Sequence, residues 1–188
     1  MIEKTPILFL VRPSHFGAFA VLWEHHGAHP RIRRVVLSKP GRPAPQAVKQ
    51  AFPAAQPSSC PEIDDVARRI KAFLEGDSIR FSLSLARLDL CSPFQQAVLR
   101  AEHGIPRGCV STYRRIARHL RRPSGARAVG MALARNPFPI IIPCHRAIRT
   151  DGTLGGYQGG LAMKRTLLEM EGIHFDSAGR LTTGKYFY

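Results

Sequence analysis

The chain has 188 residues, of which 44% are hydrophobic and 22% charged, enough for one large domain or two small ones with a core. Its 28 basic residues against 13 acidic ones give a net charge of +15. No run reaches the ~18 apolar residues of a membrane span, and the four cysteines form no dense framework, so we exclude membrane-spanning and disulfide-rich secreted proteins. We expect a cytoplasmic protein with free thiols.

Half of the arginines gather in about a quarter of the chain. Between Arg100 and Arg149 there are eleven arginines and a single acid, Glu102. The planar arginine fork suits phosphate and base edges. GC-rich codons also raise arginine content, but they do not concentrate it in one segment. The patch therefore predicts a nucleic-acid partner more than a membrane surface.

The first ninety residues predict a small α+β domain. Short β-branched or aromatic runs predict three strands, at 7–11, 16–23 and 32–37. A proline-rich loop at about 39–61 follows, with a short helix at 45–52. An amphipathic helix is expected at 63–74, and the alternation over 80–90 predicts an edge strand.

The second domain, 91–188, is expected to be mainly helical. Three N-caps (Ser92, Ser111 or Thr112, and Ser124) predict helices at 93–105, 112–120 and 125–136. An isoleucine strand (NPFPIIIP), a glycine-rich loop at 150–160 and a helix at 161–172 follow. The second and third helices, joined by RRPSG, resemble a helix-turn-helix.

The third predicted helix carries almost no side-chain bulk. Its small residues are Gly125, Ala126, Ala128, Gly130, Ala132 and Ala134. Such a surface permits close approach, either to the protein core or to a DNA backbone in a narrow groove. Because Arg127 projects from this helix among many cations, we favour DNA.

The isoleucine run is followed by Cys144, His145 and Arg146. A cysteine that only packs in the core would need no polar neighbours, so these residues favour a reactive cysteine. A thiol is strongly nucleophilic only as thiolate, so it needs a base or a positive field, and we expect Arg146 and the arginine-rich segment to add such a field. Successive side chains of a strand point to opposite faces, so His145 reaches the sulfur only if the chain turns after Pro143 or through a water. The histidine also needs a carboxylate behind it. Spacing leaves that carboxylate open among Asp151, Glu169, Glu171 and Asp176.

The segment from about Ser92 to Gly172 resembles the O6-alkylguanine-DNA alkyltransferases, the methylated-DNA–protein-cysteine methyltransferases. The resemblance rests on SPFQQAVLRA, IPRGCVSTYRRIA, ARAVGMALARNPFPIIIPCHR and LGGYQGGLAMKRTLLEMEG. It implies an α/β fold, with a small RNase-H-like α+β domain followed by the helix-turn-helix alkyltransferase domain. It implies a monomer in a prokaryotic cytoplasm that binds double-stranded DNA through the minor groove and needs no cofactor or metal.

The resemblance also implies roles for individual residues. Cys144 would accept the alkyl group from O6 of guanine in one irreversible turnover, and O4-alkylthymine is a further candidate substrate. His145 would deprotonate Cys144 through a water, with Glu171 behind it. Asn136 would hold the turn before the cysteine. Tyr113 would promote flipping of the nucleotide and protonate the departing guanine, and Arg127 would fill the vacated place.

Further residues would bind the base or the DNA. Tyr157 and Pro139 would wall the base pocket, although Tyr157 could instead pack on its own glycines. The other expected contacts are Ala126, Ala128, Gly130, Arg135, Thr150 and Gln158. Cys109 and Gln158 depart from the family pattern. The density of Glu24, His25, His26 and His29 does not predict a metal site.

Three rival functions differ in what they require of Cys144. An alkyltransferase-like protein that only marks damage would lack the cysteine. A regulatory protein with a redox-sensing cysteine would need polar side chains on its recognition helix to read the major groove. A cysteine hydrolase would usually bring its histidine from a remote part of the chain. The presence of Cys144 disfavours the first function, the bare helix the second, and the adjacency of His145 to Cys144 the third.

Overall fold

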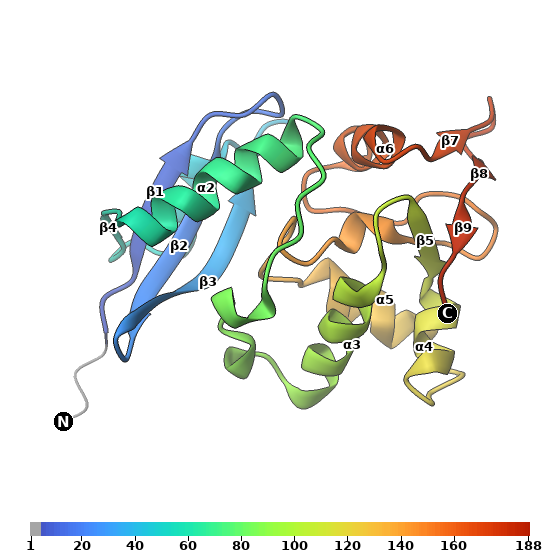
Figure 1. Cartoon of the computed structure of the whole chain (residues 1–188), viewed down its shortest axis with the longest axis horizontal. Helices are drawn as coiled ribbons and strands as arrows, with labels where there is room; N and C mark the ends of the chain where they lie inside the picture. The colour runs from blue at the N-terminus through green and yellow to red at the C-terminus, as the bar shows by residue number, and fades with distance from the viewer. Residues whose placement is uncertain (1–4) are drawn as a thin grey trace. The chain divides into compact units, whose positions relative to one another are not determined.

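The structure is a computed structural model that describes residues 5–188, which divide into two compact units (Figure 1). Unit 1 contains the described residues up to Leu88 together with Pro137–Ile141. Unit 2 contains Asp89–Asn136 and Ile142–Tyr188. The sequence predicts a division of the chain after residue 90, which does not anticipate that residues 137–141 belong to unit 1. No helix in the described part of the chain is long and apolar enough to cross a membrane.

Unit 1 is built on a four-stranded sheet in the order β3-β2-β1-β4. Its strands are β1 (Leu8–Arg12), β2 (Phe19–His26), β3 (His29–Leu37) and β4 (Gln56–Pro57). β1, β2 and β3 are antiparallel, whereas β4 joins β1 in parallel. The proline-rich segment therefore contributes a short strand that the sequence did not predict.

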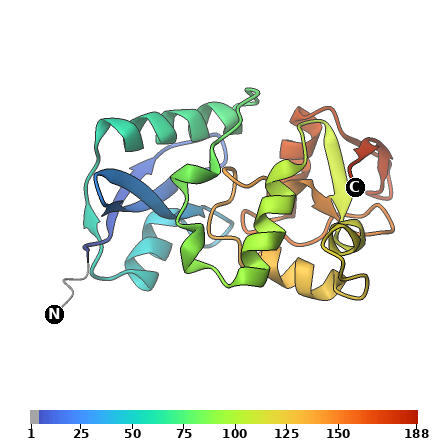
Figure 2. The same ribbon diagram turned by 60° about the horizontal axis from the view of Figure 1, so that its bottom comes forward.

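The central strand β2 is covered on both faces by helices. Ala20 and Leu22 form a buried cluster with Ala44 and Val48 of α1 (Ala44–Ala51). The alternate residues of β2 are buried on the opposite face. The second helix, α2 (Pro61–Leu74), contacts β1 and β2. Figure 2 shows the two helices on opposite sides of the sheet.

The edge strand predicted over 80–90 is wrong. This segment contains two short 3-10 helices, η1 (Leu83–Leu85) and η2 (Leu88–Leu90), with one isolated bridge between Ile32 and Ala86. The hydroxyl of Ser82 accepts a hydrogen bond from the backbone N–H of Ser84, which favours a turn over an extended chain.

Unit 2 combines four helices with short strands. The helices are α3 (Pro93–Gly104), α4 (Tyr113–His119), α5 (Ala126–Ala134) and α6 (Leu161–Met170). β5 (Cys109–Thr112) pairs in parallel with β6 (Ala147–Ile148) and β9 (Lys185–Tyr186). β7 (His174–Phe175) pairs with β8 (Leu181–Thr183). Val110, Ile148, Leu168 and Ile173 form a buried cluster where β5, β6 and α6 meet.

Two of the predicted N-caps are confirmed and one is wrong. The hydroxyls of Ser92 and Thr112 accept hydrogen bonds from the backbone N–H groups of Gln95 and Arg115. The third cap is Gly125 and not Ser124, and it offers no side-chain oxygen to α5.

The isoleucine strand predicted before Cys144 is also wrong. Prolines at 137, 139 and 143 have no N–H to give to a ladder, and Ile140 has a left-handed φ of 73°. The chain turns repeatedly between α5 and the cysteine. Within unit 1, Val35 of β3 donates its N–H to the carbonyl of Pro137 at 2.8 Å.

Candidate active site

Cys144 opens a one-turn 3-10 helix, η3 (Cys144–Arg146). Pro143 lies outside the extended region, with ψ of 60°, and the N–H of Arg146 donates to its carbonyl at 2.9 Å. The chain therefore turns after Pro143, so the opposed side chains of a straight strand do not apply to Cys144 and His145. The Cys144 side chain is 5% exposed.

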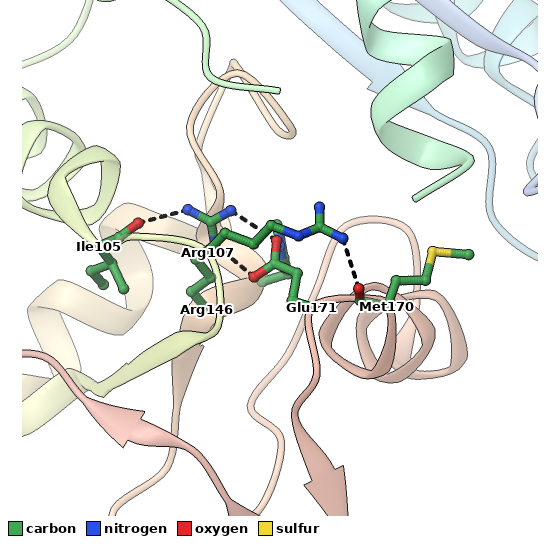
Figure 3. Close-up of polar contacts among 6 residues, drawn as sticks. Ile105, Arg107, Arg146, Met170 and Glu171 are labelled. Carbon is green, nitrogen blue, oxygen red and sulfur yellow. Dashed lines mark hydrogen bonds and ion pairs between the residues drawn. The ribbon is translucent and has the colours of Figure 1, made fainter. Parts of the chain in front are cut away.

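Glu171, the residue that caps the C-terminus of α6, joins His145 and Arg146 of η3. The Oε1 atom of Glu171 lies 2.9 Å from Nε2 of His145. Arg146 donates from Nε to Oε2 at 2.9 Å and from Nη2 to Oε1 at 2.8 Å, a two-point contact. Arg146 also donates to the carbonyl of Ile105 at 2.6 Å, and Figure 3 shows its side chain reaching between Ile105 and Glu171.

These contacts determine the charges of Glu171 and His145. Burial would raise the pKa of Glu171, but His145 and Arg146 outweigh it and bring that pKa to about 2. Burial lowers the pKa of His145 despite Glu171, so the ring is neutral at pH 7. An ionised carboxylate only accepts hydrogen bonds, so Nε2 of His145 carries the proton. The lone pair is therefore on Nδ1, which makes this nitrogen the basic one.

The other acids that the sequence left open have different partners. Asp151 accepts hydrogen bonds from the backbone N–H and the hydroxyl of Thr153. Glu169 pairs with Arg165 on the exposed side of α6. The carboxylate of Asp176 accepts from the N–H of Arg180. Of the four acids, Glu171 is the one bonded to His145.

Asn136 holds the turn that precedes the cysteine. It lies just after α5, is 1% exposed, and donates from Nδ2 to the carbonyl of Ile142 at 3.1 Å. Gln158 of the glycine-rich loop donates to the backbone carbonyl of Asn136. Burial raises the pKa of the Cys144 thiol to about 11, while a hydrogen bond with the Asn136 side chain opposes that rise.

Tyr113, the first residue of α4, packs against two glycines. A Cβ atom at Gly155 would lie 2.0 Å from the Tyr113 hydroxyl oxygen, and one at Gly130 would lie 3.8 Å from the ring. Gly155 is therefore required for the position of this ring. Burial, Glu102 and Cys144 raise the pKa of Tyr113 to about 12, so its hydroxyl keeps its proton at neutral pH.

Tyr157 lies beside the histidine. The ring centroids of Tyr157 and His145 are 6.3 Å apart and the rings meet edge to face. The Tyr157 hydroxyl is buried and has no hydrogen-bond partner among residues 5–188. A Cβ at Gly159 would lie 3.2 Å from the Tyr157 ring, so the ring also packs on the loop glycines.

The residues expected to contact DNA differ in exposure. Arg127, Ala128, Arg135 and Thr150 are exposed, Ala126, Gly130 and Gln158 are partly buried, and Pro139 is buried in unit 1. Thr150 lines a pocket of about 430 Å³ with three arginines of α4, Arg114, Arg115 and Arg118. The pocket is also lined by Thr112, His119, Tyr186 and Tyr188.

Sequence reasoning missed two roles. Arg146 was expected to supply only a positive field, yet it shares Glu171 with His145. Glu102 was noted only as the one acid of the arginine-rich segment, yet it is fully buried in α3. The helical spacing of Glu102 from Val98 and Leu99, both buried, is a signal that could have placed it in the core.

No group of three histidines, cysteines or acids placed to hold a metal ion occurs in the described part of the chain. In the histidine-rich hairpin of unit 1, the carboxylate of Glu24 forms ion pairs with Arg33 and Arg87.

Comparisons with known proteins agree on one family. Residues 93–173 match the family model described as 6-O-methylguanine DNA methyltransferase, DNA binding domain. A methylated-DNA–protein-cysteine methyltransferase of Mycobacterium leprae is 41% identical over 130 residues, 67% of this chain and 77% of the relative. One from Methanothermobacter thermautotrophicus is 46% identical over 107 residues, 57% of this chain and 60% of the relative. The crystal structure of Mycobacterium tuberculosis OGT in complex with DNA has 30% identity and a TM-score of 0.69, covering 88% of this chain and 93% of that one.

Proposed function

Because the chain belongs to the methylated-DNA–protein-cysteine methyltransferase family, we propose that it repairs DNA by moving an alkyl group from O6 of guanine to Sγ of its own Cys144. The observation that carries this proposal is a buried thiol on the same helical turn as a histidine held by Glu171. An alkyltransferase-like protein that only marks damage is disfavoured, because Cys144 is present.

The reaction needs a proton acceptor for the thiol and a proton donor for the leaving base. Because the thiol has a pKa of about 11, little thiolate exists at neutral pH without help. Nδ1 of His145 accepts the proton, directly or through a water, and Glu171 stabilises the resulting imidazolium. The S–C bond then forms as the O6–C bond breaks, and the Tyr113 hydroxyl donates its proton to the departing guanine. The thioether has no leaving group that cellular thiols displace, so each molecule acts once.

We infer that the DNA lies along α5 with its minor groove against the small side chains. Exposed Ala128 and half-buried Ala126 permit close approach, and the exposed side chain of Arg127 is long enough to replace a flipped nucleotide in the stack. Together, α4 and α5 form the proposed helix-turn-helix. The arginines of the α4 pocket supply contacts to backbone phosphates.

Other expectations stay at the level of proposals. Three antiparallel strands followed by a parallel one support an RNase-H-like unit 1. Tyr157 remains a proposed wall of the base pocket, with Arg135, Thr150, Gly130 and Gln158 as further contacts. The monomeric state, the cytoplasmic location and the absence of a cofactor stay predictions.

The test is the mass of the intact protein after incubation with duplex DNA that contains O6-methylguanine. We expect one methyl group in place of one hydrogen on wild type and no change on Cys144→Ala. The alanine variant should still bind the alkylated DNA, since phosphate contacts carry much of the affinity. An unmodified wild type, or a Cys144→Ala variant that gains a methyl group, would overturn the proposal.

A further inference from the structure

Two helices of unit 2 each bring a fully buried ionisable side chain toward η3. Glu102 of α3 and Lys164 of α6 are both 0% exposed, and both helices contact η3, which carries Cys144. The Nζ atom of Lys164 donates to the carbonyl of Ala147, the residue after η3, at 2.6 Å. Neither Glu102 nor Lys164 has a role in the transfer described above.

Glu102 has an unusual environment for a carboxylate. Both of its oxygen atoms are covered, and neither has a hydrogen-bond partner in the part of the chain that the structure describes. A buried anion without such partners is strongly disfavoured, so the group tends to keep its proton. Burial accordingly raises the pKa of Glu102 to about 8, although the charges of Lys164 and Arg146 oppose the rise.

Lys164 is also fully buried, and its pKa is likewise shifted toward neutrality by burial. Burial lowers its pKa to about 8, and the charges of Cys144 and Glu102 oppose that change. Arg146 is a second buried cation, but its charge is balanced by the two-point contact with Glu171. Lys164 is thus the cation that remains to balance a negative charge on either Glu102 or Cys144.

The remaining titratable groups around Glu102 are two tyrosines, which are uncharged at neutral pH, and exposed charged side chains of α4 and α5. Burial and the charge of Glu102 raise the pKa of Tyr113 and of Tyr188, so both tyrosines keep their protons at neutral pH. The hydroxyl of Tyr188 donates to the carbonyl of Ala101 in α3. The charged residues of α4 and α5, the elements that also pack on α3, are exposed. They are Arg114, Arg115, Arg118, His119 and Arg127.

We propose that Glu102 is a charge-balancing residue for the alkyl acceptor: the carboxylate of Glu102 and the thiolate of Cys144 compete for the buried ammonium of Lys164. The site then holds one of these two anions at a time. When the thiol gives its proton to His145, Glu102 remains protonated and Lys164 stabilises the thiolate. When Glu102 ionises, the thiolate is disfavoured. This inference rests on the proposed function of Cys144.

Glu102 should oppose the thiolate of Cys144 more strongly as the pH rises. Below pH about 8 the Glu102 side chain is mostly uncharged, so replacing it by glutamine changes little. Above that pH the carboxylate of wild type ionises while Lys164 begins to lose its proton, so the charge on Glu102 suppresses the thiolate, which glutamine cannot do. The two proteins should therefore diverge only on the alkaline side, and the coupled groups of wild type should titrate in more than one step.

The experiment compares wild type with Glu102→Gln between pH 6 and pH 10. The rate of carbamidomethylation of Cys144 by iodoacetamide is followed by peptide mass spectrometry, so that Cys60, Cys91 and Cys109 do not contribute. At neutral pH we expect the rates of wild type and Glu102→Gln to agree within about twofold. At the alkaline end we expect the Cys144 of Glu102→Gln to react at least about threefold faster than that of wild type. Methyl transfer from O6-methylguanine in DNA should show the same divergence.

Matched variants separate charge from structure. Glu169→Gln removes an exposed acid of α6 and should leave the profile unchanged. Lys164→Met should slow Cys144 at neutral pH, where Lys164 is charged, and adding Glu102→Gln to it should have no further effect, because the shared cation is gone. If Glu102→Gln does not fold, Glu102→Leu takes its place. Superimposable profiles of wild type and Glu102→Gln, or a slower variant, would overturn the proposal. Because iodoacetamide needs no DNA, this result is independent of whether methyl transfer occurs.

Discussion

The Oε1 atom of Glu171 lies 2.9 Å from Nε2 of His145, and this contact determines which ring nitrogen is basic. The carboxylate has a pKa of about 2 and is ionised at neutral pH, so it can only accept. The proton of the neutral ring is held on Nε2, and the lone pair lies on Nδ1. In this tautomer, Nδ1 is the ring nitrogen that can accept the proton of Cys144.

Replacing Glu171 by glutamine should slow alkylation at neutral pH. The amide cannot stabilise the imidazolium that forms when His145 takes the thiol proton, so we expect a loss of about tenfold to a hundredfold. Raising the pH should recover much of the rate, because more thiolate then forms unaided. The measurement is single-turnover alkylation against pH, with Glu169→Gln as the control. A Glu171→Gln variant as fast as wild type at pH 7 would remove Glu171 from the mechanism.

The same substitution should cost stability, because Arg146 shares the carboxylate. The pKa of Glu171 falls from 4.5 to about 2 on folding, so the ionised carboxylate contributes about 3 kcal/mol to the free energy of unfolding at neutral pH. A depressed pKa stabilises the fold above the unfolded value and loses that effect as the pH falls toward 2. Urea unfolding of wild type and Glu171→Gln should therefore differ most near pH 7 and converge near pH 2. A difference that does not change with pH would contradict this assignment.

Gly155→Ala should displace Tyr113, since the new Cβ would lie 2.0 Å from its hydroxyl oxygen. We expect a loss of about 1–3 kcal/mol in stability, typical of overpacking, and slower methyl transfer. Gly156→Ala is a matched control, because a Cβ there meets no atom of the described residues within 4 Å. Thermal unfolding and single-turnover rates of the two variants provide the comparison. Equal behaviour of the two would mean that the position of Tyr113 is not needed.

Arg127→Ala should slow transfer from duplex DNA much more than transfer from free O6-benzylguanine, if that base is a substrate. The free base needs no flipping, so the side chain that replaces a flipped nucleotide has no role with it. Arg118→Ala is the appropriate control, because it removes an exposed arginine of the α4 pocket. Arg122 is less suitable, since it lies over the ring of Phe94 at 5.5 Å. Equal slowing with both substrates would assign Arg127 a structural role.

Much of the fold could be predicted because local signals decide it. Short β-branched or aromatic runs located β1 to β3, and the N-caps Ser92 and Thr112 located the starts of α3 and α4. The isoleucine run misled because its composition is typical of a strand, whereas its prolines and the left-handed Ile140 prevent a ladder. The segment 80–90 alternates like a strand but contains short 3-10 turns.

The site was predictable where residues are adjacent or follow a motif, and less so where the fold brings them together. Cys144 and His145 could be selected from sequence, and the resemblance implied Glu171. Spacing alone could not choose among Asp151, Glu169, Glu171 and Asp176, because the choice depends on how α6 packs on η3. For the same reason, the buried positions of Glu102 and Lys164 toward η3 become visible only in the folded chain.

The identity of the alkyl acceptor can be decided by locating the methyl group after the reaction. Wild type is incubated with an excess of duplex DNA that contains O6-methylguanine, digested, and its four cysteine peptides are analysed by mass spectrometry. We expect one methyl group on Sγ of Cys144, none on Cys60, Cys91 or Cys109, and no further transfer when fresh substrate is added. Methylation at Cys109, or repeated turnover with Cys144 unmodified, would show that Cys144 is not the acceptor.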